Sequence, residues 1–162
     1  MTTTDTPLPV IKDVRDLLVG LLGKEVTLSP TGPLAPGPST PASVAVYTDD
    51  SLQLRAVIAC DLAFSARAGA ALALMPPGSA DAALEEGALN ETLRDNLYEV
   101  LNIAASLFNV GDAPHVKLYD LHPAGPPLTP DVRVRTLTLG RREDLAVDIA
   151  GYGEGRLSIV LC

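Results

Sequence analysis

The sequence predicts an α+β fold, with two or three helices packed on a mixed or antiparallel sheet of about six strands. Two observations support this fold class. Strand-like stretches occur in blocks rather than in regular alternation with helices, and no glycine-rich phosphate loop is present, which disfavours a doubly wound nucleotide-binding fold. In addition, apolar residues make up 47% of the 162 residues, which is enough for one domain with a hydrophobic core.

The first half of the chain is expected to contribute a helix and three strands. Residues 1–8 are interpreted as a flexible N-terminal tail and residues 9–162 as a single domain. Apolar residues recur at helical spacing over 9–22, and Gly23 is a suitable stop. Strands are then expected at 24–28, 43–48 and 52–60, with a long proline-rich loop over 29–43.

The rest of the chain, from Asp61 onward, is expected to contain two helices followed by strands. Asp61 is a good N-cap for a helix over 62–74, and an acidic connector over 79–86 leads to a long helix over 87–109. Afterwards the period of the apolar residues shortens toward two, which predicts strands at 115–121, 132–137, 145–149 and 155–161, with a second proline-rich loop over 122–130. The last of these strands is apolar and is a candidate for pairing with another chain at a sheet edge.

Charge and composition exclude several classes of partner. The net charge is −8, whereas proteins that bind nucleic acid or anionic membranes need clustered Lys and Arg. No apolar run reaches the length of a membrane span, and the N-terminus lacks the features of a signal peptide. The two cysteines suggest neither a disulfide framework nor a metal site. We therefore expect a cytoplasmic protein that binds no metal of its own.

The long helix over 87–109 carries the most informative pattern of the sequence. Its apolar residues gather on one side, as a helix packed on a core requires. The opposite side is polar, and its members are Asp95, Glu99, Asn102, Ser106 and Asn109. Solvated helices commonly show such a polar side, so the spacing of these residues matters more than their polarity.

The spacing resembles the signature of the CheC/CheX/FliY phosphatases. That signature consists of Asp or Ser, three residues, Glu, two residues and Asn, followed by about twenty-two residues and a proline. This chain has Asp95, Glu99 and Asn102 at the same intervals, with Pro123 or Pro126 downstream. It departs from the pattern at Ser106, where the family usually has glycine, and it carries one ExxN motif, as in CheX, where CheC commonly has two.

The resemblance implies a CheC-like fold and a specific chemistry. CheX-like phosphatases hydrolyse the aspartyl phosphate of a response-regulator receiver domain. By analogy, Asn102 would orient the attacking water and Glu99 would pair with the lysine of the receiver's active site, with Asp95 and Ser106 as partner-binding residues. The receiver would supply Mg²⁺. The family analogy also suggests a homodimer joined through a sheet edge.

Two other functions remain open. The chain could be a catalytically inactive CheX-like module that binds a receiver without hydrolysing its phosphate. Alternatively, it could be an unrelated structural or assembly subunit, in which the polar side of the helix is simply solvated.

Overall fold

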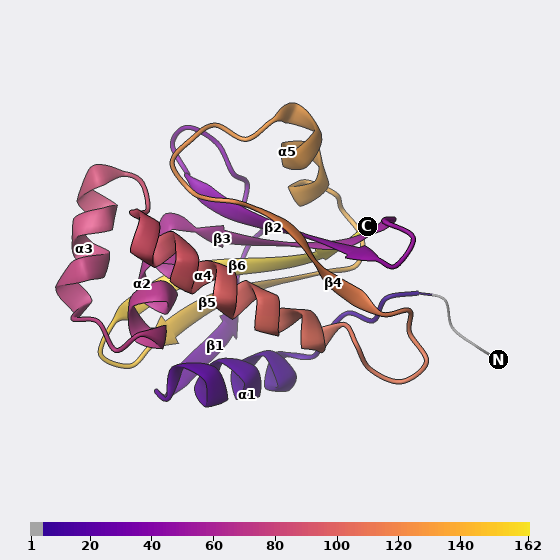
Figure 1. The fold of residues 1–162 in the computed structure, drawn as a ribbon, viewed down its shortest axis with the longest axis horizontal. Coiled ribbons are helices and arrows are strands. Elements are labelled where there is room, and N and C mark those ends of the chain that lie inside the picture. Colours follow the sequence, from indigo (N-terminus) through magenta and orange to yellow (C-terminus); the bar gives the residue numbers. More distant parts are fainter. Residues whose placement is uncertain (1–4) are drawn as a thin grey trace.

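The computed structural model describes residues 5–162, which form one six-stranded sheet with helices on both faces (Figure 1). Every pair of neighbouring strands is antiparallel, in the order β1-β5-β6-β3-β2-β4. The strands are β1 (Val26–Pro30), β2 (Ala42–Asp49), β3 (Leu54–Asp61), β4 (Val116–His122), β5 (Arg142–Ile149) and β6 (Gly153–Leu161). The α+β class and the six strands predicted from the sequence are confirmed.

Three helices cover one face of the sheet: α1 (Ile11–Leu22), α2 (Leu62–Leu72) and α4 (Glu91–Ala104). Their buried residues form the main core with alternate residues of the strands, for example Val14 and Leu97 with Ala45, Ile58 and Ile159. This alternation is what a sheet with two covered faces requires, because successive side chains point to opposite faces.

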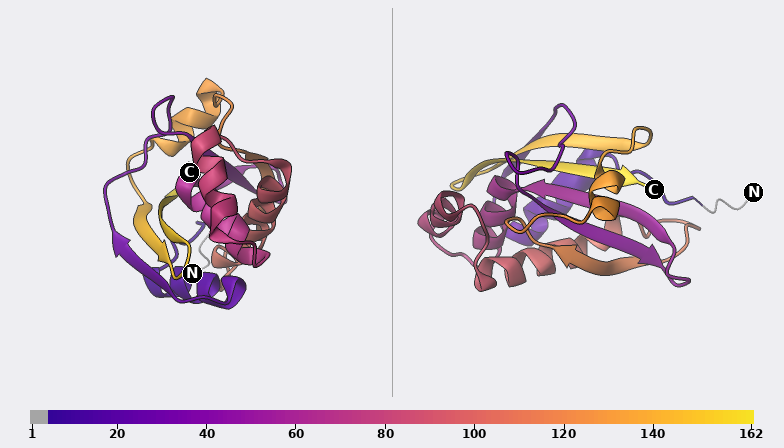
Figure 2. Two further views of the ribbon diagram at one scale, coloured as in Figure 1. Left: turned by 90° about the vertical axis from the view of Figure 1, so that its left-hand side faces the viewer. Right: turned by 90° about the horizontal axis from the view of Figure 1, so that it is seen from above.

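The other face carries a thinner layer, made of α5 (Pro130–Thr136) and the loop over residues 31–41. Leu34 of that loop is buried against Val44, Val57 and Val160, and Val132 of α5 packs on the same cluster. Figure 2 shows α5 and α1 on opposite sides of the molecule, with strands between them. A further helix, α3 (Pro77–Glu86), packs on α2 through alanines of both helices.

The C-terminal strand β6 lies in the middle of the sheet, between β5 and β3. The expectation that this apolar strand is a free edge for another chain is therefore wrong. Its apolar character has a different cause: its central position buries Leu157, Ile159 and Val160. The strands with a free edge among the described residues are β1 and β4.

The capping signals of the sequence are confirmed at both early helices. Gly23 ends α1 in the left-handed conformation, with φ of 66°, where glycine has no Cβ to clash. The Asp61 carboxylate accepts a hydrogen bond from the Phe64 backbone N–H at 2.8 Å and so caps α2.

Three predicted elements differ from the structure. The acidic connector over 79–86 belongs to helix α3, because Pro77 starts the helix and Gly87 ends it. The strand predicted over 132–137 is helix α5, and its alternating Val and Arg residues misled the period assignment. The helix predicted over 87–109 is shorter: α4 spans 91–104, and a single 3₁₀ turn continues it over Ala105–Leu107.

The tail expected over residues 1–8 falls partly outside the described residues. Within its described part, Thr6 is buried, and its carbonyl accepts a hydrogen bond from the Arg141 guanidinium. Leu8 packs against the main core.

Candidate functional site

The polar side of helix α4 is the candidate site, and the helix is fixed by its cap and its apolar side. The Asn90 side chain accepts a hydrogen bond from the Leu93 backbone N–H at 2.8 Å and sets the first turn. The sequence interpretation missed this cap because it began the helix at Gly87. The buried side of α4 consists of Leu93, Leu97, Val100, Leu101 and Ala104.

Three contacts fix the position of α4 relative to α2 and the sheet. At Gly69 of α2, an added Cβ would lie 2.9 Å from the Leu93 carbonyl oxygen, so the absence of a side chain lets the helices approach closely. Next to it, the Asn96 side-chain amide donates to the Gly69 carbonyl at 3.0 Å. From the sheet, the buried Tyr47 hydroxyl donates to the Leu101 carbonyl at 2.5 Å, and burial raises the pKa of this tyrosine well above its ordinary value. The helix is thus held on two sides.

The C-terminal end of the polar stripe has a structural role. The Asn109 side chain donates to the Val116 carbonyl at 2.8 Å and accepts from the Val116 N–H at 2.7 Å. It therefore fastens the end of the helical segment to the start of β4. Asn109 belongs to the polar side predicted from the sequence, but its side chain stabilises the fold and is not available to a partner.

The other four residues of the stripe are all exposed: Asp95, Glu99, Asn102 and Ser106. Within residues 5–162, their side chains make no hydrogen bond or ion pair with the protein. Glu99 and Asn102 are one helical turn apart, so they project from the same side of α4. They are available to a partner.

Two exposed apolar residues accompany this polar pair. Tyr98 is 44% exposed and Ile103 is 37% exposed, and each lies next in sequence to one member of the pair. Sequence reasoning missed them because it considered only polar residues on the exposed side of the helix. The exposed side of α4 therefore combines a carboxylate, an amide and two apolar side chains, a composition suited to contact with another protein.

The downstream prolines of the motif lie in the loop that follows β4. Pro123 is half-buried directly after the strand, whereas Pro126 is exposed and lines a cleft with residues of the 31–41 loop. The loop reaches the connection between α3 and α4, where an added Cβ on Gly125 would lie 2.7 Å from the Ala88 Cβ.

Over residues 5–162, no group of three or more His, Cys, Asp or Glu side chains could hold a metal ion. None of the helices found there is both long and apolar enough to cross a membrane.

No protein-family model and no curated protein matches the sequence. Solved structures do match. A chain in the crystal structure of the FliM–SpeE complex from H. pylori has a TM-score of 0.59 at 8% identity, over 93% of this chain and 80% of that chain. The FliM middle domain from Vibrio alginolyticus has a TM-score of 0.57 at 13% identity, over 92% and 86%.

The third structure is FliY from Thermotoga maritima, with a TM-score of 0.52 at 14% identity, over 91% of this chain and 82% of that chain. This chain has the fold of FliM and FliY. The FliM/FliY fold is also present in a crystal structure of the FliG–FliM complex from H. pylori. At these identities the likeness establishes the fold, and the chemistry has to be argued from the residues of α4.

Proposed function

We propose that this protein is a cytoplasmic CheX-like phosphatase, which hydrolyses the aspartyl phosphate of a response-regulator receiver domain through Glu99 and Asn102 of α4. The observation that carries the proposal is that these two side chains are exposed and unpaired. They project from a helix that hydrogen bonds hold to α2 and to strand β2. The FliM/FliY fold supports it, because FliY belongs to the phosphatase family that the ExxN spacing resembles.

The chemistry requires little beyond placement of one water. A water oxygen attacks the phosphorus in line with the acyl oxygen, the P–O bond breaks, and the products are inorganic phosphate and a free aspartate on the receiver. The Asn102 amide can accept from this water through Oδ1 and donate through Nδ2 without titrating. Phosphoryl transfer depends mainly on such positioning and on charge stabilisation, for which the receiver would contribute its own Mg²⁺.

Glu99 has a different role in the proposal. Its carboxylate would pair with the lysine of the receiver's active site and so fix the docked orientation. At an exposed rim such a pair contributes about 0.2–1 kcal/mol, whereas loss of one partner at a desolvated interface centre costs roughly 2–5 kcal/mol. Asp95 and Ser106, on the same exposed side, would contact the surrounding receiver surface. Tyr98 and Ile103 provide the apolar area that can exclude water from the pair.

The decisive experiment compares turnover and binding. Receiver domains phosphorylated with acetyl phosphate are mixed with the protein, and phosphate loss and binding are measured separately. We expect Asn102→Ala to lower the rate by about 10²–10³ while binding stays within a few-fold, because the amide acts on the transition state. Glu99→Ala should weaken binding as well. Arg94→Ala is the matched control, since Arg94 is an exposed residue of α4 outside the stripe. Parental turnover by Asn102→Ala would refute the assignment.

A second candidate function follows from the matched structures. FliM is found there in complexes with FliG and with SpeE, so the FliM/FliY fold serves as a platform for protein partners. On this reading the chain is a binding module of a flagellar switch or of a related assembly, and the exposed side of α4 binds without hydrolysis. A receiver that binds but loses phosphate at its intrinsic rate would favour this module over the phosphatase. A homodimer remains part of the proposal, with β1 and β4 as the available sheet edges.

A further inference from the structure

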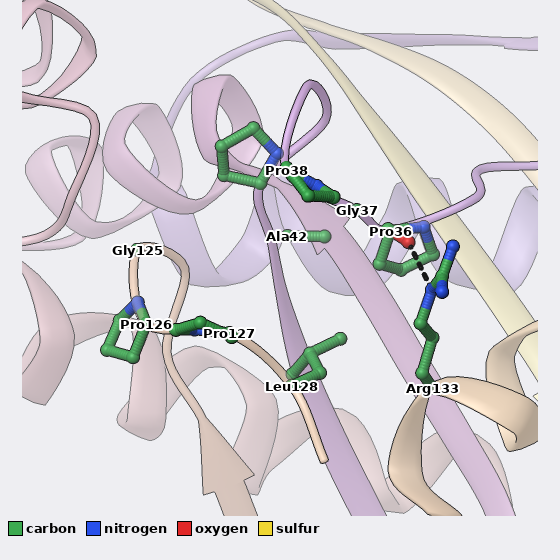
Figure 3. Close-up of a pocket in the computed structure, with 10 residues that line it drawn as sticks. Pro36, Gly37, Pro38, Ala42, Gly125, Pro126, Pro127, Leu128 and Arg133 are labelled. Carbon is green, nitrogen blue, oxygen red and sulfur yellow. Dashed lines mark hydrogen bonds between the residues drawn. The ribbon is translucent and has the colours of Figure 1, made fainter. Parts of the chain in front are cut away.

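The two proline-rich loops, far apart in the sequence, lie on the face of the sheet away from α4. Together they line an open cleft (Figure 3). Its volume is about 440 Å³, within the range of natural ligand pockets. One wall comes from residues 36–42 and the other from residues 125–128. The second loop carries the downstream prolines of the motif, but the mechanism proposed for α4 assigns no chemical step to either loop.

The walls of the cleft consist largely of pyrrolidine rings. Five prolines line it: Pro36, Pro38, Pro41, Pro126 and Pro127. Proline has no backbone N–H, so these residues offer ring C–H groups and carbonyl acceptors but no donors. Ring C–H groups carry partial positive charge, and the face of an aromatic ring is negative. Proline and aromatic surfaces are therefore complementary, as in the recognition of proline-rich peptides by aromatic grooves.

Among the residues that line the cleft, Arg133 is the only charged one. Its Nε donates to the Pro36 carbonyl at 3.0 Å, which holds the side chain across one end of the cleft (Figure 3). Within residues 5–162, the structure shows no hydrogen-bond acceptor for its terminal nitrogens. The planar fork of a guanidinium matches a carboxylate and also stacks on aromatic rings. A ligand with a carboxylate next to an aromatic ring satisfies both features of the cleft.

The cleft is preorganised by hydrogen bonds on both walls. Gly37 and Thr40 exchange two backbone hydrogen bonds of 3.0 Å, which close a tight turn around Pro38. On the other wall, the Ala124 N–H donates to the buried Ser43 hydroxyl at 3.0 Å and anchors the start of the loop. Because the walls are already ordered, binding loses little conformational entropy.

The exposure of the walls decides between a small molecule and a peptide. Pro36 and Ala42 at the base are buried, but Pro38, Pro126 and Pro127 are exposed. Sites for small molecules enclose most of the ligand surface, which this open cleft cannot do. A peptide needs only one side chain enclosed, since the rest of the segment gains contacts along the exposed edges.

We propose that this cleft binds an extended peptide segment of a partner protein, with an aromatic side chain between the two proline walls and a neighbouring carboxylate on Arg133. The site is separate from the exposed side of α4, and the proposal does not depend on phosphatase activity.

The test uses the absence of tryptophan from this chain. An acetylated and amidated heptapeptide, Gly-Ser-Asp-Trp-Glu-Ser-Gly, is titrated with the full protein, and tryptophan fluorescence then reports on the peptide alone. We expect a saturable blue shift, since the indole leaves water. Arg133→Gln should weaken binding about tenfold, as removal of one charged partner of a close pair does. Higher salt should weaken binding to the parent protein but have little effect on the variant.

Arg135→Gln is the matched control, because it removes the same charge from the same short helix without touching this cleft. It should bind within about twofold of the parent. A heptapeptide with Asn and Gln in place of the acids should bind weakly and be insensitive to Arg133→Gln. The double variant Pro126→Ala/Pro127→Ala should weaken both peptides, since it removes ring contacts. Thermal melting of each variant shows that the fold is intact.

Any of the following outcomes would overturn the proposal. In the first, the heptapeptide does not bind at millimolar concentration. In the second, Arg133→Gln binds as well as the parent, or a peptide with lysines in place of the acids binds equally well. In the third, phenylacetate, a free aromatic acid, binds as tightly as the heptapeptide, which would make the cleft a small-molecule site.

Discussion

Two glycines show how differently the same residue can be constrained. Gly155 of β6 faces helix α2, and an added Cβ would lie 2.5 Å from both the Cα and the N of Phe64. Gly20, on the exposed side of α1, has nothing within 4 Å of such a Cβ. The first glycine permits a close approach of helix and sheet. Gly20 makes no close contact possible, and glycine at this position only lowers the helix propensity of α1.

We therefore predict opposite effects for the same substitution. Gly155→Ala should lower the free energy of unfolding by about 1–3 kcal/mol, because Phe64 backbone atoms would have to move. Gly20→Ala should raise it by roughly 0.5–1 kcal/mol, because alanine favours the helix. Urea unfolding followed by circular dichroism measures both values. Equal effects at the two positions would contradict the close approach of β6 and α2.

At the same scale, the sequence predicted the placement of Glu99 and Asn102 on one helix better than it predicted the contacts around them. The spacing of Glu99 and Asn102 predicted that they share a side of one helix, because helical geometry is local. It could not predict that Asn109 binds Val116, since that contact depends on where β4 begins. The roles of Glu99 and Asn102 in catalysis stay predictions.

At the scale of elements, α5 depends on a polar cluster beneath it. The Arg142 guanidinium binds the Asp144 carboxylate with two nitrogens and also donates to the Thr136 carbonyl at the end of α5. The Ser158 hydroxyl donates to the same carboxylate at 2.6 Å. Partial burial alone would raise the pKa of Asp144, but the hydrogen bonds from Arg142 and Ser158 hold it below its ordinary value.

This cluster makes stability depend on pH in a defined direction. The pKa of Asp144 is lower in the folded than in the unfolded chain, so its contribution is present above the ordinary value of 3.8 and is lost as pH falls through the folded pKa. Asp144→Asn should lower the free energy of unfolding at pH 7 by about 1.5–3 kcal/mol, the usual worth of hydrogen bonds to charged groups. The difference from the parent should shrink below about pH 4.

The control for this prediction lies on the same strand. Asp148 is exposed and outside the cluster, so Asp148→Asn should change the free energy of unfolding at pH 7 by no more than about 0.5 kcal/mol. Urea titrations at several pH values provide the measurement. A constant difference between the parent and Asp144→Asn from pH 7 to pH 3 would show that the charge of Asp144 does not act as described.

The elements predicted correctly are those whose signals are local. Asp61 and Gly23 mark helix ends through their own backbone and side-chain chemistry. Helix α5 was misread because Val132 and Val134 alternate with arginines, as in a strand. Only one of these two valines is needed by the core: Val132 packs on the sheet, whereas Val134 is 62% exposed. Whether this segment forms a helix or a strand depends on its tertiary contacts, which the alternation of valine and arginine does not reveal.

At the scale of the whole molecule, the sheet joins opposite ends of the chain. Strand β1, near the N-terminus, pairs with β5, and β6 pairs with both β5 and β3. The sequence predicted the α+β class and about six strands, but not this strand order. Strand order follows from pairing between distant segments, for which the single sequence gives no direct signal.

Such pairing predicts slow folding. Non-local strand pairs require long loops to close before contacts form, so refolding should take milliseconds to seconds. Stopped-flow dilution from urea can follow it through tyrosine fluorescence, since Tyr47 is fully buried and the chain has no tryptophan. Refolding that finishes within microseconds would contradict the observed topology.

The central place of β6 has a consequence for synthesis. Every other strand of the sheet leaves the ribosome before β6 does, yet β6 alone joins the half that contains β1 and β5 to the half that contains β2, β3 and β4. Until residues 153–161 emerge, β3 and β5 each present an unpaired strand edge to the cell, and such edges recruit other chains. Nascent chains that stall before this point should therefore be the form of the protein that chaperones hold most strongly.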